Sequence, residues 1–62
     1  MINNDENLLK IGNQAFLSKN YKKAIDIYSY ALEKYRGTVL ESILIRNIDR
    51  TKDHIERQET FQ

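Results

Sequence analysis

Apolar residues recur at helical spacing in the middle of the chain, between residues 21 and 35. Their spacing follows the i, i+3, i+4, i+7 pattern of a helix with one apolar face. No segment shows sustained alternation of apolar and polar residues, as a half-buried strand would. The sequence therefore predicts an all-α fold that includes a helix over 21–35. The apolar face of this helix consists of Tyr21, Ala24, Ile25, Tyr28, Ala31, Leu32 and Tyr35.

Another helix is predicted over 5–18, on the N-terminal side of the helix over 21–35. The linker, Ser18–Asn20, is so short that the two helices must be antiparallel neighbours, and Asn20 is the expected N-cap. Gly12 lies inside this helix, where glycine costs about 1 kcal/mol relative to alanine, so we expect another backbone to approach closely there. The apolar residues at helical spacing are Leu8, Leu9, Ile11, Ala15 and Phe16.

A third helix is predicted over 38–58. Gly37 is expected to end the preceding helix with a positive φ, and Thr38 with Glu41 matches a capping box that starts the next one. The three helices together predict a single domain over 1–62, in a three-helix unit with a frayed C-terminus. The apolar stripe of the third helix consists of Leu40, Leu44, Ile48, Thr51 and Ile55.

The chain is short for an independent domain. A chain of this size buries only about 60% of its unfolded surface, and the absence of cysteine excludes disulfides. The net charge of +1 argues against binding to nucleic acid. No apolar run is long enough for a transmembrane segment or a signal peptide. We therefore expect a cytoplasmic protein that is stabilised by other protein chains.

Residues 12–33, GNQAFLSKNYKKAIDIYSYALE, resemble a tetratricopeptide repeat. The spacing of large and small apolar residues is similar to that of the repeat, although Arg36 replaces its closing proline. The resemblance implies an antiparallel helix pair with a third packing or capping helix, and a non-catalytic role in protein–protein interaction. It also implies a repeat core of Leu8, Ile11, Gly12, Ala15, Phe16, Tyr21, Ala24, Tyr28, Ala31 and Leu32.

The groove of such repeats can bind the acidic C-terminus of a peptide when a lysine precedes an asparagine of the first helix by four residues. Asn13 matches this asparagine, but Leu9 stands in place of the lysine. This difference favours the interpretation of Asn13 as an exposed or locally hydrogen-bonded residue.

A second resemblance extends from Ala15 to about Ile55. The stretch NYKKAIDIYSYALEKYRGTVLESILIRNIDR is similar to the N-terminal helical segment of bacterial capsular and other surface-polysaccharide glycosyltransferases. This resemblance implies an alternative function, as a dimerising or positioning segment of such an enzyme whose catalytic domain is absent from this chain.

No group of residues in the sequence indicates catalysis. Asp53 is next to His54, but adjacent residues of a helix do not face one another, so His54 is expected on a solvated face. Asp53 and Arg57 are expected to form an ion pair at i, i+4 spacing. We therefore predict that the chain is not an enzyme and that it needs no cofactor, metal or small-molecule substrate.

Apolar residues outside the predicted core are expected to form contacts between chains. Ile27 and Tyr30 form a second apolar strip on the helix over 21–35, and Ile45 lies outside the stripe of the third helix. A homodimer is favoured, through a two-fold contact of the third helix with its counterpart, and another protein is the alternative partner. Asn47 would set the register of this contact. The predicted interaction residues are Ile27, Tyr30, Leu44, Ile45, Asn47 and Ile48.

Overall fold

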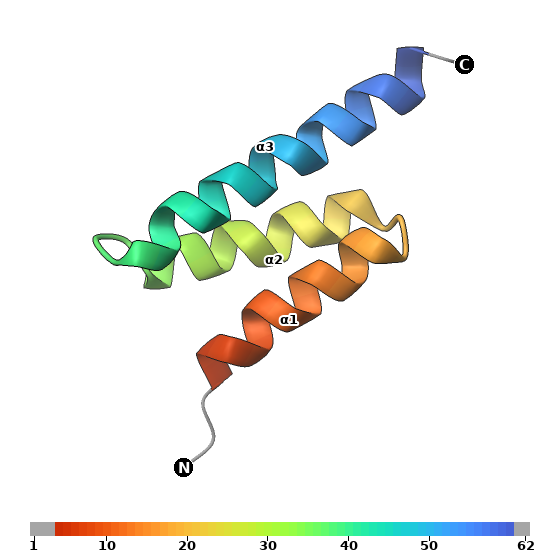
Figure 1. The fold of residues 1–62 in the computed structure, drawn as a ribbon. Helices are drawn as coiled ribbons and strands as arrows, with labels where there is room; N and C mark the ends of the chain where they lie inside the picture. The colour runs from red at the N-terminus through yellow and green to blue at the C-terminus, as the bar shows by residue number, and fades with distance from the viewer. Residues whose placement is uncertain (1–3, 61–62) are drawn as a thin grey trace.

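The computed structural model describes residues 4–60, which form three α-helices joined by two short turns (Figure 1). The all-α prediction is confirmed, because the described residues contain no strand. Residues 1–3 and 61–62 of the predicted domain lie outside the described residues. None of the described helices is both long and apolar enough to cross a membrane. The helices are α1 (Asn4–Leu17), α2 (Tyr21–Lys34) and α3 (Val39–Thr60), each within two residues of the predicted bounds.

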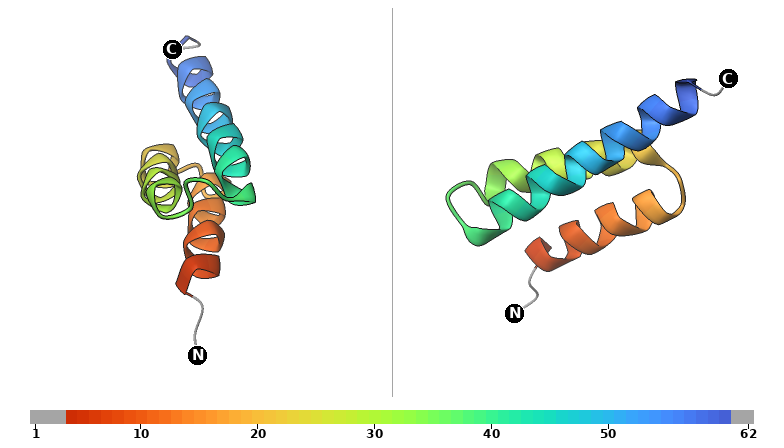
Figure 2. Two further views of the ribbon diagram at one scale, coloured as in Figure 1. Left: turned by 90° about the vertical axis from the view of Figure 1, so that its left-hand side faces the viewer. Right: turned by 45° about the horizontal axis from the view of Figure 1, so that its top comes forward.

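The central helix of the arrangement is α2. Both α1 and α3 pack on it, and they contact each other only sparsely. In the left view of Figure 2, α1 and α3 lie one below the other on one side, and α2 lies on the other side. A helix with two packing partners needs a broad apolar face, which is the feature that the sequence shows most clearly between residues 21 and 35.

The turn between α1 and α2 is fixed by backbone hydrogen bonds. The N–H of Asn20 donates to the carbonyl of Ala15 at 2.9 Å. The N–H of Lys19 donates to the carbonyl of Phe16 at 3.0 Å. These two bonds form a Schellman motif, in which Lys19 has a φ of 65° at a position that usually holds glycine. Asn20 precedes α2 as predicted, although its side chain makes no capping hydrogen bond.

The turn between α2 and α3 matches the prediction in part, because α2 ends at Lys34 with Tyr35 as its C-cap, and Gly37 lies in the turn after the helix end instead of capping it. Gly37 adopts a φ of 83°, and the Thr38 hydroxyl oxygen accepts a hydrogen bond from the N–H of Leu40 at 3.2 Å. The Glu41 carboxylate accepts a hydrogen bond from the N–H of Gly37 at 3.0 Å. The capping box is therefore present in a variant form, since Glu41 reaches the residue before the N-cap instead of the N-cap itself.

All three helices contribute apolar side chains to the core. One polar residue, Thr51 on α3, is completely buried with them. Its hydroxyl donates a hydrogen bond to the carbonyl of Asn47 at 2.7 Å, so this buried polar group is satisfied. The small alanine side chains let the helices approach closely. The buried apolar residues are Ala15 from α1, Ala24, Tyr28 and Ala31 from α2, and Leu44 and Ile48 from α3.

One residue of the predicted repeat core, Ile11, does not belong to the core, because it is 44% exposed. The reason is that α1 packs mainly on α2, so the flank of α1 that carries Ile11 has no further helix over it. Of the other predicted core residues, Gly12, Ala15, Ala24, Tyr28 and Ala31 are buried, and Leu8, Phe16, Tyr21 and Leu32 are half-buried.

Gly12 is at a point of close approach, as its cost within a helix suggested. A Cβ atom at this position would lie 2.6 Å from Cε1 and 2.8 Å from Cδ1 of Tyr28. The neighbour is thus the ring of a buried tyrosine and not another backbone, which corrects the prediction. The glycine leaves the space that the ring of Tyr28 occupies against α1.

Candidate functional site

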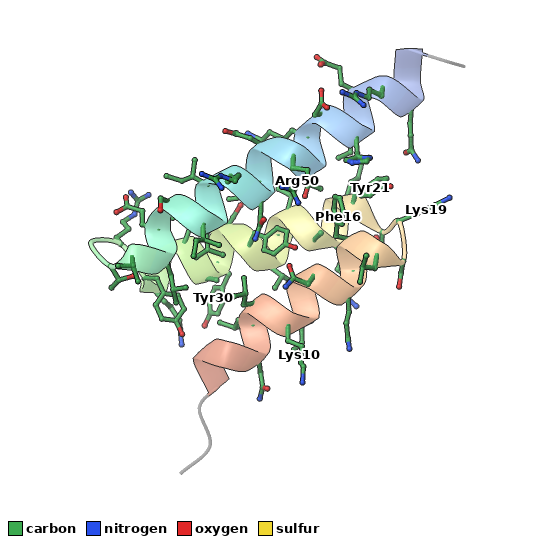
Figure 3. The ribbon with its side chains drawn as sticks, viewed as in Figure 1. Lys10, Phe16, Lys19, Tyr21, Tyr30 and Arg50 are labelled. Carbon is green, nitrogen blue, oxygen red and sulfur yellow. The ribbon has the colours of Figure 1, made fainter. Side chains whose placement is uncertain are left out.

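A pocket of about 50 Å³ is lined by residues of all three helices. We call the surface around this pocket, between α1 and α3, the groove. Figure 3 views this side of the molecule and labels Phe16 on α1 and Arg50 on α3. Ligand pockets usually measure about 300–1,000 Å³, so this one has room for a single functional group instead of a whole small molecule. We call its lining the groove pocket: Asn13, Phe16, Tyr28, Asn47, Arg50 and Thr51.

Tyr28, which lines the groove pocket, connects α2 to α1. Its hydroxyl donates a hydrogen bond to Oδ1 of Asn13 at 2.5 Å. Burial raises the pKa of the Tyr28 phenol above its ordinary value of 10.0, and the positive charge of Arg50 opposes this to a smaller extent. The phenol is therefore neutral at neutral pH and remains a donor. Since the bond uses only Oδ1, the carboxamide nitrogen of Asn13 retains its own donors.

The raised pKa of Tyr28 predicts that the fold loses stability in alkaline solution. The unfolded phenol ionises near 10.0, whereas the folded phenol keeps its proton to higher pH. The contribution of this group is fully present below the unfolded pKa and is lost as the pH rises through the folded pKa. We expect Tyr28→Phe to show a weaker decrease in the free energy of unfolding above about pH 10 than the native chain, in urea denaturation followed by circular dichroism.

Tyr30→Phe is the matched control for this pH dependence. Tyr30 is 57% exposed on the same helix, so its replacement should leave the alkaline loss of stability unchanged. An identical pH dependence in the native chain and in Tyr28→Phe would contradict the assignment of this loss to the buried phenol.

Arg50 brings a positive charge to the groove. It lies three residues after Asn47, so the two side chains share one face of α3. No acidic side chain in the described part of the chain forms an ion pair with Arg50. The guanidinium of Arg50 is therefore available to a group from another molecule.

The ion pair predicted between Asp53 and Arg57 is confirmed, with 3.1 Å between Oδ2 and Nε.

Three aromatic rings, one from each helix, meet at the end of the groove near the first turn. The ring of His54 lies 5.1 Å from that of Phe16 in an edge-to-face arrangement. It also stacks on Tyr21 with 5.4 Å between the ring centroids. His54 is half-buried, so the prediction of a solvated face was wrong. The pattern of α3 alone did not show that this part of the helix passes over Phe16 and Tyr21.

The predicted interaction residues on α3 lie on different sides of the helix. Leu44 and Ile48 belong to the buried core, with exposed fractions of 1% and 9%. Asn47 lines the groove pocket, whereas Ile45 is 44% exposed on the opposite flank of the helix. Of these four residues, only Ile45 is exposed on that flank, where a second chain could contact it.

The two predicted interaction residues on α2 also differ in exposure. Ile27 is half-buried against the core, and Tyr30 is exposed with the ammonium of Lys34 5.5 Å from its ring centroid. The residues that the sequence reasoning missed are Arg50, which i+3 spacing from Asn47 could have indicated, and the exposed apolar side chains of Leu17, Val39 and Ile43.

Neither metal ligands nor known relatives help to interpret the groove. Within the described residues, no group of three His, Cys, Asp or Glu side chains is arranged to hold a metal ion. No family model, no curated protein and no solved structure matches the chain. The interpretation of the groove therefore depends on the side chains that line it.

Proposed function

We propose that the chain is a non-catalytic helical module that binds a segment of a partner protein in the groove between α1 and α3. The proposal depends on one observation. Arg50 lines the groove pocket together with Asn13 and Asn47, whose side chains are carboxamides. A guanidinium beside amide donors suits a carboxylate. The partner segment is therefore expected to place an acidic side chain or its C-terminal carboxylate in the pocket.

The face of α3 that borders the groove also offers apolar contact. Ile43 is 45% exposed and precedes Asn47 by four residues, which places both on one face of the helix. A polypeptide segment that carries an apolar residue beside its acidic group would match this surface. Binding sites commonly combine a few placed polar groups, which fix the orientation of the ligand, with apolar contact area.

The resemblance to a tetratricopeptide repeat supports the same class of function. The antiparallel pair α1–α2, followed by α3, is the arrangement that this resemblance implies, and membership of the repeat class is part of our proposal. The alternative, an N-terminal segment of a surface-polysaccharide glycosyltransferase, stays a prediction, and no feature of the groove favours it.

The groove is tested by nuclear magnetic resonance titration with short acidic peptides that have a free C-terminus. We expect the side-chain amide signals of Asn13 and Asn47 to shift with an acidic peptide and not with a lysine peptide of equal length. An amidated version of the acidic peptide distinguishes the chain-end carboxylate from acidic side chains. Arg50→Met should weaken binding by about tenfold or more, because a charge-assisted hydrogen bond contributes about 1.5–3 kcal/mol.

Arg46→Met provides the matched control. Arg46 is exposed on α3, one turn before Arg50, and does not line the groove pocket. Its replacement removes the same charge from the same helix and should leave the affinity nearly unchanged. Equal weakening by both replacements would mean that the peptides respond only to net charge, and the proposed groove function would then fail.

A further inference from the structure

The molecule has two long edges that face away from each other. They lie on opposite sides of the layer that α1 and α3 form around the groove. One edge is formed by α3, and the other is formed by α1 and α2 on the side turned away from α3. The left view of Figure 2 shows α1 and α3 at opposite ends of this layer. Neither edge takes part in the groove, so an inference about them goes beyond the proposed function.

The edge formed by α3 is acidic and contains one exposed apolar residue. At about 100° per residue, the flank opposite to Asn47 and Arg50 carries every third or fourth residue from Glu41 onward. Ile45 lies in this row and is 44% exposed. Three carboxylates and one ammonium group give the row a net charge of −2. We call it the α3 edge: Glu41, Ile45, Asp49, Lys52 and Glu56.

The edge formed by α1 and α2 is basic and more apolar. Figure 3 labels Tyr30 on the side of α2 that is turned away from α3, and its ring interacts with the ammonium of Lys34. Ile11 and Lys23 line the same shallow hollow between α1 and α2. The two lysines give this surface a net charge of +2. We call it the α1–α2 edge: Ile11, Lys23, Ile27, Tyr30 and Lys34.

We propose that the α3 edge of one copy docks on the α1–α2 edge of a second copy, in a head-to-tail contact. The two edges have opposite charge, and each has at least one exposed apolar residue beside its charged groups. In helical repeat arrays each unit packs on its neighbours, and an end that packs on nothing needs a polar outer face. The α1–α2 edge of this unit lacks such a face, since Ile11 and Tyr30 are about half-exposed, and Ile45 adds one exposed apolar side chain to the α3 edge.

The charges disfavour the two-fold contact of α3 with its counterpart. That contact would bring two surfaces of net charge −2 together, and like charges across an interface oppose association. Leu44 and Ile48, which were predicted to contribute to it, are buried in the unit's own core. A head-to-tail contact instead uses two different surfaces, so it leaves one edge free at each end and the assembly can grow.

Light scattering tests the growth and the charge dependence. We expect the average mass of the native chain to rise beyond that of two chains between about 10 µM and about 1 mM, the range in which weak association is measurable. Raising the salt concentration from about 0.01 M to about 1 M shortens the Debye length from about 30 Å to about 3 Å and should lower this mass. A constant monomer mass over the whole range would overturn the proposal.

A mixing experiment separates the head-to-tail contact from a two-fold one. Tyr30→Glu damages only the α1–α2 edge, and Ile45→Glu damages only the α3 edge. Each variant alone should be monomeric, and an equal mixture should form a complex of two chains that does not grow further. A two-fold contact of α3 predicts instead that Tyr30→Glu dimerises alone and that mixing has no effect. That result would overturn the proposal.

Leu17→Glu is the matched control for both variants. Leu17 is 77% exposed on α1 and belongs to neither edge, so this variant should associate as the native chain does. Circular dichroism of all three variants checks that they keep native helix content. Arg50→Met should also leave association unchanged, so failure of the groove proposal and failure of the head-to-tail proposal can be told apart. Loss of association in Leu17→Glu with native helix content would contradict the assigned edges.

Discussion

Leu44→Ala is expected to unfold much of the population at room temperature. Leu44 is a leucine of the buried core, with an exposed fraction of 1%. Replacing a buried leucine by alanine costs about 2–5 kcal/mol. Domains of this size rarely have more than about 3–5 kcal/mol of stability from a single core. Thermal denaturation followed by circular dichroism in the helix band measures the loss.

Ile45→Ala is the control for this prediction. Ile45 is the next residue on the same helix and is 44% exposed, so at low protein concentration the change should cost no more than about 1 kcal/mol. Both variants remove apolar side-chain atoms from adjacent positions and differ mainly in burial. If both variants melted at the same temperature, the packing of α3 on α2 through Leu44 would be wrong.

Gly12→Ala is expected to destabilise the fold, although alanine favours a helix by about 1 kcal/mol over glycine. The added Cβ would lie 2.6 Å from Cε1 of Tyr28. The ring of Tyr28 is 2% exposed, so it cannot move aside without disturbing other core residues. Overpacking of this kind costs about 1–3 kcal/mol. Since each kcal/mol changes the Tm of such a domain by about 4–8 °C, calorimetry or circular dichroism resolves the effect easily.

The same substitution in a Tyr28→Leu background isolates the cause. The shorter side chain of leucine removes the ring atoms that a Cβ at position 12 would meet. In that background alanine should be neutral or stabilising, because only its helix propensity remains. The double-mutant cycle then gives a coupling energy between the two positions. A rise in Tm for Gly12→Ala in the native background would contradict the close approach.

The sequence predicts the helices well because their signals are local. The bounds of α2 differ by one residue from the prediction, since an apolar face repeated over four turns depends only on residues within the helix. The start of α3 is equally local, because Thr38 and Glu41 act on backbone groups that lie within four residues. Such interactions are readable from spacing alone.

Features that depend on how the helices cross were not predictable in this way. The hydrogen bond from Tyr28 to Asn13 joins residues 15 positions apart, and the contact of His54 with Phe16 joins two helices that share few other contacts. A single-helix pattern does not reveal which flank of α3 faces α1. The positive φ of Lys19 was missed for another reason, because nothing in a lysine side chain favours that conformation.

The ring cluster at the end of the groove gives the molecule its own spectroscopic reporter. His54 is the only histidine of the chain, and its imidazole lies against Tyr21 from α2 and Phe16 from α1. The magnetic fields of these two rings displace the imidazole proton signals from their positions in an unfolded chain. The imidazole proton signals of this histidine should therefore report whether all three helices are docked, without any label being attached.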